Sequence, residues 1–468
     1  MTINEFKQTL NDEEIENADH IYVEGCKNLK GLELFKNIES IILVGDEESY
    51  SCITSIDLSK FPKLFRFKIE DYAITSLDAT YSPNLFNVSV VKCREFTSIK
   101  VDSERDDFAV FLNHLPKLTS MENCVFNHVH LVDFFKTGIQ DIDISNHPTL
   151  GTLSVKGDDD DLYELNSVNV SGCDNLWDLE LVNVKLQSVR LHALPVFHAL
   201  DLHQCQTTDL TVENMANLGD IKCDGCTIQN LTIKGCPELT SVDCSDNSLR
   251  NLVIDDSPNL GSLYAANNQL MWLDMSNVQS VSGIDSNWFI VDNQQPGAVA
   301  YKLSPTEVGL RVHERMDPSR MLNLVTNGVS VTATETTIDG IRYIVFSNEG
   351  ANAESLRGKA CTYEYETKWP YDWIEDSENT KDNNLPVLLS VTAIEKLPSW
   401  IKLSSAETLK SMVDGTLTPP TVNRSDKYDG ALTYESSNEK AVKVNATTGE
   451  LTIVGSGSAT ITVRGAET

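Results

Sequence analysis

The chain has few basic residues for its acidic ones and lacks any long apolar run. Its 37 Lys and Arg stand against 69 Asp and Glu, a formal net charge of −32 over 468 residues. Nucleic acid is excluded as a partner, because phosphate binding needs a basic face. No stretch approaches the roughly 20 consecutive apolar residues of a membrane helix, so we expect no membrane insertion. The opening MTINEFKQTL also lacks the basic start and apolar core of a secretory signal.

Motifs that would indicate catalysis are missing as well. His313-Glu314 lacks the second His, four residues after the first, that a zinc-protease helix carries. The chain has no Gly-x-Ser-x-Gly elbow and no phosphate-cradling loop with Lys. His192, His198 and His203 fall at different positions of the repeat described next, so we expect them to face solvent or to bond locally. The sequence therefore favours a protein that is not an enzyme and has no cofactor.

The chain does contain a repeat of 21 residues from Leu176 onward. Its leading apolar residue recurs at Leu176, Phe197, Leu218, Leu239, Leu260 and Val281. Within a unit the apolar positions are the first, fourth and sixth, then the eleventh, fourteenth and sixteenth, and this local alternation predicts two short strands per coil. A short fixed period predicts a solenoid in which each coil buries its apolar edge by stacking on its neighbours.

The ninth position of the repeat holds Cys205, Cys226, Asn247 and Asn268 in successive coils. A side chain pointing inward at a tight bend there can satisfy backbone groups of the neighbouring turns. The pattern resembles the leucine-rich repeat family, Leu-x-x-Leu-x-Leu-x-x-Asn/Cys-x-Leu. The second half of the repeat, Leu-x-x-Leu-x-Ile followed by a small or polar residue and often by Pro (Pro195, Pro237, Pro258), resembles the variant common in surface proteins of the Bacteroidetes. The resemblance implies a leucine-rich repeat solenoid that is α/β or mainly β, and a role at the cell surface.

Coils can be traced toward the N-terminus with less regular spacing. Their apolar starts are Ala18, Ile38, Leu64, Leu85, Leu118 and Leu150, which makes twelve coils in all. The segment Asp106–Leu118 has an apolar stripe of helical spacing, and Val129–Gln140 is expected to be a second helix or a covered turn. Such additions either pack on the convex side or form an extra rim. Residues 1–17 are predicted to be a cap with a weakly amphipathic helix containing Phe6, Leu10 and Ile15.

The eleven cysteines are an odd number without the spacing of a disulfide framework. We expect buried thiols, because many fall on repeat positions that favour a small buried residue: Cys26, Cys93, Cys205, Cys223, Cys226 and Cys244. A zinc site made of Cys223, Cys226, Cys236 and Cys244 is the weaker interpretation. The acidic run Asp158–Asp161 predicts a solvated turn, and a calcium loop is its weaker alternative because the spaced ligands of a known cage are missing. We therefore expect no metal.

The repeat ends near Val291, so the solenoid is assigned to residues 18–291 and its end to the bulky Ile284, Trp288 and Phe289. Residues 292–298 are expected to be a linker. Short β-branched segments separated by turns such as Asp339-Gly340 predict a β domain of uncertain type over residues 299–397. A hydrolase hidden in that region is one alternative function.

The last segment, residues 398–468, carries the turns Ser436-Ser437-Asn438 and Thr448-Gly449 and the run Gly455–Gly457. It resembles the bacterial immunoglobulin-like domain of group 2, which implies an all-β sandwich. In that family such modules are spacers and adhesive domains of bacterial surface proteins.

A solenoid displays the outward residues of its strands as rows, and the regular block predicts a partner-binding face there. Its residues are Trp177, Asp178, Glu180, Asp201, His203, Asp220, Asp224, Asp243, Asp246 and Tyr264. Acids stacked about 4.8 Å apart repel one another, so such a column is either well solvated or retained for a basic partner or cation. Earlier coils present a different set: His20, Tyr22, Phe65, Arg66, Lys68, Phe86 and Lys92.

A second candidate is an aromatic cluster formed by Tyr363, Tyr365, Trp369, Tyr371 and Trp373. Exposed rings can stack on sugars, although such rings also pack turns onto their own sheets. Our interpretation is a monomeric, non-enzymatic recognition or adhesion protein, secreted or on the cell surface, that binds a macromolecule, a protein in the first instance. We expect this chain to be a trimmed form of an exported protein. A glycan-binding protein that uses the aromatic cluster and an intracellular scaffold are the alternatives.

Overall fold

The computed structural model describes residues 12–279, 288–303, 307–326, 328–347, 358, 360–371, 383–397, 399–404, 417–426 and 428–466. It divides into two compact units, Met1–Pro296 with Glu364–Leu388, and Gly297–Tyr363 with Leu389–Thr468. Helical structure is sparse. The described helix is α2 (Asp12–Asn17), and short 3-10 turns are η1 (Leu32–Leu34), η2 (Tyr50–Cys52), η3 (Leu58–Lys60), η4 (Met121–Asn123) and η5 (Pro318–Arg320).

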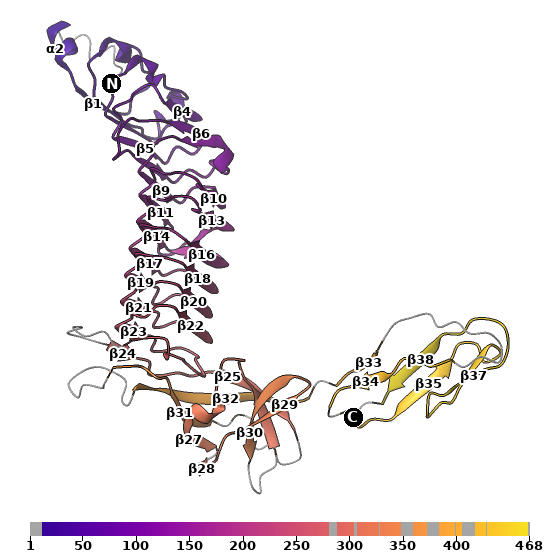
Figure 1. Ribbon diagram of the computed structural model, residues 1–468. Coiled ribbons are helices and arrows are strands. Elements are labelled where there is room, and N and C mark those ends of the chain that lie inside the picture. Colours follow the sequence, from indigo (N-terminus) through magenta and orange to yellow (C-terminus); the bar gives the residue numbers. More distant parts are fainter. Residues whose placement is uncertain are drawn as a thin grey trace. The chain divides into compact units, whose positions relative to one another are not determined.

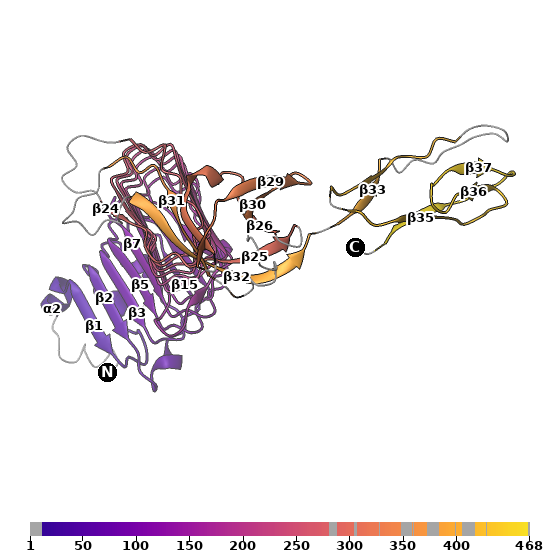
Figure 2. The same cartoon turned by 90° about the horizontal axis from the view of Figure 1, so that it is seen from below.

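The first unit is a β-solenoid built on one parallel sheet of 13 strands (Figure 1). In order these are β1 (His20–Glu24), β2 (Ser40–Val44), β3 (Arg66–Glu70), β5 (Asn87–Val91), β7 (Ala109–Asn113), β9 (Leu131–Phe135), β11 (Thr152–Lys156), β14 (Asp178–Val182), β17 (Ala199–His203), β19 (Asp220–Lys222), β21 (Ser241–Asp243), β23 (Ser262–Tyr264) and β24 (Trp288–Ile290). Side chains alternate between the buried interior and the outside along each strand. Viewed along the stack, successive coils overlie one another (Figure 2).

The other edge of the coils carries shorter parallel sheets. They are β4 (Ser76–Ala79), β6 (Ser98–Val101) and β8 (Cys124–Phe126), then the pair β10 (Asp141–Asp143) and β13 (Ser167–Asn169), then β16 (Ser188–His192), β18 (Asp209–Glu213), β20 (Asn230–Lys234) and β22 (Asn251–Asp255). A further pair joins β12 (Tyr163–Glu164) and β15 (Val184–Lys185). The predicted mainly β solenoid is thus confirmed. Most coils have the expected second strand, but among the described residues none follows β1, β2 or β23.

The interior contains the apolar residues that the repeat predicted to lead each coil. Leu176, Phe197, Leu218, Leu239 and Leu260 are all 0% exposed. The strands that follow them pair in register, so these residues stack in file as expected. Val281, the sixth predicted start, lies outside the described residues, as does Ile284, whereas Phe289 is buried in the last strand, β24.

In several coils an inward side chain with hydrogen-bonding capacity stabilises the bend after the first strand, as the ninth position predicted. The amide nitrogen Nδ2 of Asn268 donates to the carbonyl oxygens of Cys244 (3.0 Å), Ala265 (3.1 Å) and Ala266 (3.1 Å), and its Oδ1 accepts from the backbone N–H of Leu249 (2.9 Å). Asn247 makes the same bonds one coil earlier. Cys205 Sγ lies 3.2 Å from the carbonyl oxygen of Leu181, a weaker version of the same contact.

The residue before each ladder position adopts a left-handed backbone in most coils. Examples are Lys92, His114, Lys136, Asn183, Gln204, Asp246, Asn267 and Asn293, with φ between 49° and 59°. Only Gly adopts this conformation without cost, and Asn and Asp tolerate it better than other residues. The coil therefore turns sharply at this position, which allows the ninth side chain to point inward.

Two segments, one predicted to be a helix and the other a helix or a covered turn, contain strands instead, and this changes the number of coils. Asp106–Leu118 contains β7 and Val129–Gln140 contains β9, so the sheet has one strand more than the twelve expected coils. Their outward residues include Ala109, Phe111 and Leu131, which are apolar like the inward ones. Because both faces of the strands are apolar, the period-two signal is lost, and the combined pattern mimics a helical stripe.

The N-terminal cap and the acidic run agree with the sequence where they are described. The helix α2 buries Ile15, whereas Phe6 and Leu10 lie outside the described residues. Asp158–Asp161 form a turn with backbone hydrogen bonds between its two ends. Asp159 accepts a bond from Asn183 Nδ2 (2.9 Å), and Asp161 pairs with Lys136. The run is a solvated turn held to its neighbours by side-chain contacts.

The cysteines are all free. The six that were assigned to coil positions are at most 4% exposed, so their predicted burial is confirmed. Cys52 is exposed and Cys124 is half-buried. Burial raises the pKa of the Cys93 thiol to about 12, and burial raises the pKa of Cys223 and Cys244 as well.

A segment from much later in the chain packs on the end of the solenoid within the first unit. The ring of Trp369 stacks on Phe289 of the last strand, with centroids 4.7 Å apart. The backbone N–H of Met275 donates to the carbonyl oxygen of Thr367 (2.8 Å), and the N–H of Leu388 donates to that of Gln294 (2.9 Å). Gln294, expected in the linker, is 1% exposed and extends the inward ladder by donating to the carbonyl oxygen of Ala265 (2.8 Å).

The second unit contains most of an eight-stranded sheet, whose strands β31 and β32 each run across the boundary between the units. The order is β28 (Val329–Ser330), β27 (Met321–Thr326), β31 (Ala360–Glu366), β32 (Asn384–Lys396), β25 (Gly297–Lys302), β26 (Glu307–Arg311), β30 (Ile341–Ser347) and β29 (Thr334–Ile338). Antiparallel pairs follow: β33 (Ile401–Leu403) with β34 (Val422–Arg424), β35 (Leu432–Ser436) with β38 (Ile461–Gly465), and β36 (Val442–Val444) with β37 (Leu451–Ile453). The described part of the region is all-β, and its immunoglobulin-like identity stays a prediction.

Candidate interaction face

We use the name outer face for the outward side chains of the 13-stranded sheet. The register of the sheet places one residue of each strand in a continuous central row. From β1 to β24 the row reads Tyr22, Ile42, Lys68, Ser89, Phe111, Asp133, Ser154, Glu180, Asp201, Lys222, Asp243, Tyr264 and Ile290. Adjacent members are about 4.8 Å apart, the spacing of paired strands. Acids are most frequent from Glu180 to Asp243, where Lys222 lies between two aspartates, and the row ends in Tyr264 and Ile290.

Eight of the ten predicted solenoid-face residues lie on or directly before these strands. Trp177 is 48% exposed and precedes β14. Asp201, His203 and Asp220 are exposed on β17 and β19, and Asp178, Glu180, Asp243 and Tyr264 are half-buried on β14, β21 and β23. Asp224 and Asp246 lie in the bends after the strands, where Asp246 accepts a bond from Asn267 Nδ2 (2.7 Å).

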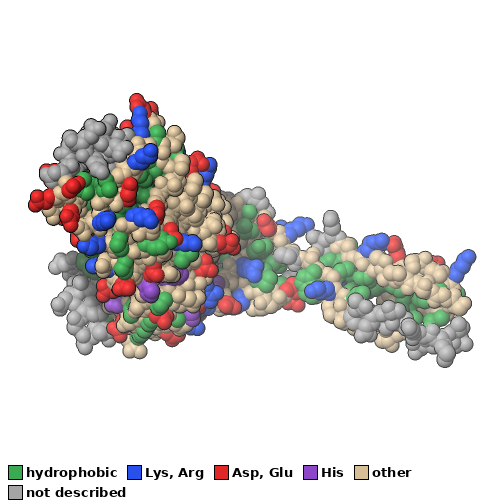
Figure 3. All heavy atoms as spheres, turned by 90° about the horizontal axis from the view of Figure 1, so that it is seen from above, with side chains coloured by type: hydrophobic (Ala, Val, Ile, Leu, Met, Phe, Trp, Pro, Cys, Tyr) green, Lys and Arg blue, Asp and Glu red, His purple; other side chains and the backbone are tan. Residues whose placement is uncertain are grey.

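We define the acidic half of the outer face as Asp178, Glu180, Asp201, Asp220 and Asp243. In this half Glu180 pairs with Lys156 (2.8 Å), whereas the four aspartates form no ion pair among the described residues. Burial, followed by repulsion from Glu180 and Asp201, raises the pKa of the Asp178 carboxyl. Seen from above, acidic side chains are spread over the solenoid with apolar ones among them (Figure 3). The raised pKa means that ionisation of Asp178 costs folding stability at neutral pH.

At the edge of the sheet where β14 begins, aromatic side chains pack together. A Cβ at Gly151 would lie 2.4 Å from His130 Cε1 and 2.7 Å from Trp177 Nε1, so both rings lie over the glycine. Further along this edge Phe65 and Phe86 stack with centroids 5.1 Å apart, and the Arg105 guanidinium lies 5.1 Å from the Phe65 centroid. Gly151 is thus the small residue that lets Trp177 fold back while half of it stays exposed.

The sequence missed an apolar patch of the outer face, which we define as Val91, Phe111, Leu131 and Phe135. These side chains come from β5, β7 and β9, and all four are half-buried. Phe135 also contacts the ring of His114, with centroids 5.1 Å apart. The signal that would have found them is Val129-x-x-Val132-x-Phe134, which has the spacing of the repeat but was interpreted as a helix or covered turn.

The predicted glycan-binding site in the aromatic cluster is wrong for the four of its residues that the structure describes. Tyr363, Tyr365, Trp369 and Tyr371 are 3%, 0%, 7% and 8% exposed, and Trp373 lies outside the described residues. Trp369 is covered by Phe289, and the hydroxyl of Tyr371 donates to the carbonyl oxygen of Gln279 (3.2 Å). These rings fill the interior and leave no face for a sugar, as the packing interpretation held.

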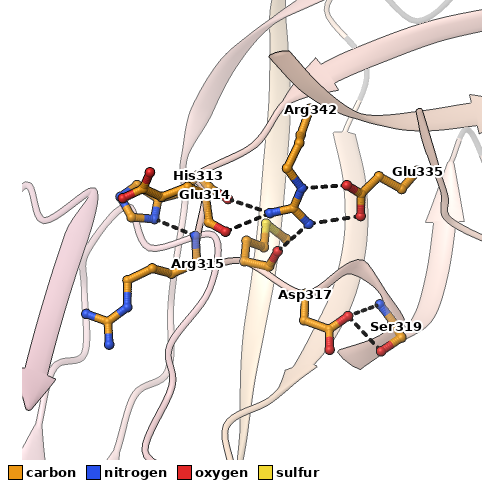
Figure 4. Close-up of polar contacts among 8 residues, drawn as sticks. His313, Glu314, Arg315, Asp317, Ser319, Glu335 and Arg342 are labelled. Atoms are coloured by element: carbon orange, nitrogen blue, oxygen red, sulfur yellow. Dashed lines mark hydrogen bonds and ion pairs between the residues drawn. The ribbon is translucent and has the colours of Figure 1, made fainter. Parts of the chain in front are cut away.

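His313 and Glu314, the remnant of a zinc-protease motif, belong to a structural corner of the second unit (Figure 4). Arg342 makes a two-pronged ion pair with Glu335 and donates to the carbonyl oxygens of Glu314 (2.7 Å) and Met316 (2.9 Å). Burial lowers the pKa of the His313 imidazole. The guanidinium fastens the turn onto β29 and β30, and we assign it no chemical role.

The described residues contain no group of three or more His, Cys, Asp or Glu side chains placed to hold a metal ion. No helix among them is long and apolar enough to span a bilayer. A hollow of about 250 Å³ is lined in part by Lys136, Thr137 and Tyr163. Its polar groups bond to their surroundings, Lys136 to Asp161 and Thr137 to Tyr163. It offers no unpartnered group that points to a ligand.

Comparison with known proteins leaves the family open. No protein-family model matches the chain, and no curated protein does. Among solved structures, the chain is similar to the functional domain of InlJ from Listeria monocytogenes, which includes a cysteine ladder. The TM-score is 0.36 at 13% sequence identity, and the likeness covers 82% of this chain and 83% of that one. So distant a likeness carries no argument about function, and the β-solenoid stands on its own strand register.

Proposed function

We propose that this chain is a leucine-rich repeat recognition protein that binds a macromolecular partner, protein in nature, through the outer face and catalyses no reaction. The observation that carries the proposal is the outer face itself, where outward rows of a 13-stranded parallel sheet retain solvent exposure. A stack of coils with an open sheet offers many weak contacts over an extended surface, which suits recognition of a large partner.

The electrostatics of the acidic half support the same function. Asp178 has a raised pKa, and Asp201 and Asp220 form no ion pair among the described residues. Charges that destabilise a fold are retained where a partner of opposite charge neutralises them. A negative field also accelerates the encounter with a cationic partner and selects against acidic ones.

The proposal places the protein at the cell surface or outside the cell, with the second unit as a spacer. The resemblance of residues 398–468 to bacterial immunoglobulin-like modules supports this placement, as does the all-β character of their described part. The solenoid then acts as a monomer that presents its outer face to the partner.

Site-specific photo-crosslinking tests the proposed function. A photo-crosslinking amino acid replaces Lys222 in the acidic half, and in a control protein it replaces Thr232 on β20 of the opposite edge. Each protein is mixed with purified candidate extracellular proteins, irradiated and examined by mass spectrometry. We expect crosslinks to one partner from position 222 and none from position 232.

Two results would count against this function. Equal crosslinking from both positions would show that the outer face is not selective. Turnover of any substrate in a broad hydrolase screen, abolished by a substitution in the second unit, would favour an enzyme instead.

A further inference from the structure

The outer face has two chemically different parts that lie side by side. The apolar patch spans β5, β7 and β9, and the acidic half spans β14, β17, β19 and β21. Only β11 separates them. Its outward residues Thr152 and Ser154 are small and buried, and the third, Lys156, is half-buried and pairs with Glu180 (2.8 Å) and Asp133 (4.0 Å). A single segment of a partner can therefore contact both parts at once.

Phe111 of the apolar patch is the one apolar residue of the central row between Lys68 and Asp243. In the central row, Phe111 stands between Ser89 and Asp133, and the corresponding residues of β3 and β14 are Lys68 and Glu180. Phe111, Leu131 and the other members retain partial exposure. Clustered apolar side chains on an otherwise polar face are typical of contact sites for another protein.

The charges near the patch are already paired, in contrast to those farther along. Lys68 and Lys92 both pair with Glu70, at 2.7 and 3.5 Å, and Lys156 pairs with Glu180. Beyond Glu180, Asp201, Asp220 and Asp243 form no ion pair among the described residues, although Asp243 accepts a hydrogen bond from the backbone N–H of Ser245 (3.1 Å). Lys222 lies between Asp201 and Asp243 in the central row, but the five acids of the acidic half outnumber it, so this part of the outer face carries net negative charge.

On the basis of the proposed function, we propose that the partner presents a protein segment with cationic side chains. At one end this segment carries apolar side chains that anchor it, which we call the apolar anchor. Its apolar or aromatic side chains contact Phe111, Leu131 and Phe135, and its Lys and Arg side chains pair with the acidic half. The path from β5 to β21 crosses seven strand steps, roughly 34 Å at about 4.8 Å each. An extended segment of about 11 residues covers this length at about 3.3 Å per residue.

Binding of defined peptides to the full chain tests this inference. The probe is a fluorescein-labelled peptide of about 12 residues with Leu and Phe in one half and Lys and Arg in the other. Three matched peptides replace the apolar half with Ser, the cationic half with Glu, or both halves with neutral polar residues. Fluorescence anisotropy is recorded at about 50 mM and about 200 mM NaCl, because screening distinguishes the ionic part of binding.

We expect the first peptide to bind at least tenfold more tightly than each of the others, and to weaken severalfold at the higher salt concentration. Neutralising four acids on the outer face is expected to lower its affinity at least tenfold and to flatten the salt dependence. These substitutions are Asp178→Asn, Glu180→Gln, Asp201→Asn and Asp243→Asn. A control with equal charge change elsewhere on the solenoid should retain affinity within twofold: Asp160→Asn, Asp174→Asn, Asp256→Asn and Glu238→Gln.

The apolar anchor has its own variants. Leu131→Thr and Phe135→Thr keep strand-forming residues at these positions, and thermal melts show that the protein tested is folded. We expect each to weaken the first peptide severalfold and to leave the peptide with Ser in place of its apolar half unchanged. An equal loss of affinity for both peptides would show that Leu131 and Phe135 do not bind the apolar half of the peptide.

The outcomes separate this inference from the proposed function. If the acidic or neutral peptide binds as tightly as the cationic one and the outer-face variants abolish its binding, the face recognises proteins but not by this chemistry. If the first peptide binds no better than its Ser counterpart, the inference is wrong even where photo-crosslinking from position 222 succeeds.

Discussion

At the scale of single residues, the ninth position of the coil shows how one site accepts two different side chains. Asn268 donates to three carbonyl oxygens and accepts one backbone N–H, whereas Cys205 contacts carbonyl oxygens through its thiol. Both are small, both are buried, and both can donate at a bend where backbone carbonyl groups converge. The amide satisfies more backbone groups than the thiol does, so the two are not equivalent in energy.

Asn268→Ala is expected to lower the free energy of unfolding by about 2 to 3 kcal/mol or more, because buried carbonyl and N–H groups lose their partner. Urea unfolding followed by circular dichroism measures the change. The control is Asn277→Ala at an exposed position, which should change stability by no more than about 0.5 kcal/mol. Equal effects of the two substitutions would refute the role assigned to the ladder.

Thiol reactivity provides a second prediction at this scale. The thiolate is the reactive form, and burial raises the pKa of Cys93 and of Cys124 to about 12. We expect Cys52, which is exposed, to react first with a thiol reagent at a pH of about 8. Cys52→Ser should remove the fast phase, and denaturant should release all remaining thiols. A fast phase that survives in Cys52→Ser would contradict the burial of the others.

The pH dependence of Asp178 is a third prediction. Its pKa is raised in the folded protein, first by burial and then by neighbouring carboxylates. The folded state therefore holds this proton more firmly than the unfolded chain, and ionisation costs stability at pH values above the folded pKa. Asp178→Asn should raise the urea midpoint at pH about 7.5, and the gain should shrink as the pH is lowered toward about 4. A gain that is constant across this range would rule out the electrostatic explanation.

At the scale of elements, strands β7 and β9 show where a periodic signal fails. Inward residues such as Val110 and Val132 are accompanied by outward apolar residues such as Phe111 and Leu131. A half-buried strand is recognised by alternation, and these strands have little. These outward apolar residues remain half-buried on the outer face.

The end of the solenoid is also an element-scale feature, because residues from a distant segment complete it. Trp369→Ala removes the ring stacked on Phe289 and is expected to cost about 3 to 5 kcal/mol of stability. The matched change in the same unit is Trp177→Ala, at an exposed ring, which should cost about 1 kcal/mol or less. Thermal and urea unfolding distinguish them. Comparable losses would mean that Trp369 does not seal the last coil.

At the scale of the whole molecule, the net charge of −32 is the dominant feature. Self-repulsion among so many carboxylates destabilises the compact state, and added salt screens it. We expect the melting temperature to rise between about 20 and about 300 mM NaCl. Choline chloride at the same ionic strength should give the same rise. A much larger rise with calcium chloride at matched ionic strength would indicate a specific cation site rather than screening.

The sequence alone determined the solenoid, because a coil that repeats every 21 residues must place its leading residues in one file, as Leu176, Phe197 and Leu218 are. It also predicted the burial of six thiols, since the repeat assigns inward positions to Cys26, Cys93, Cys205, Cys223, Cys226 and Cys244. The outward rows followed from the same alternation, and they placed Glu180, Asp201 and Asp243 on one face before any coordinates.

Only the tertiary structure decided what lies beside these rows and what closes the stack. Phe111 and Leu131 join the outer face because β7 and β9 pair with their neighbours, and pairing between distant segments overrides an ambiguous local pattern. Trp369 is buried because it meets Phe289, 80 positions earlier in the numbering (369 − 289 = 80). Local periodicity predicts which side of its own coil a residue faces. Contacts between segments far apart in the chain produce no periodic pattern, so the sequence does not predict them.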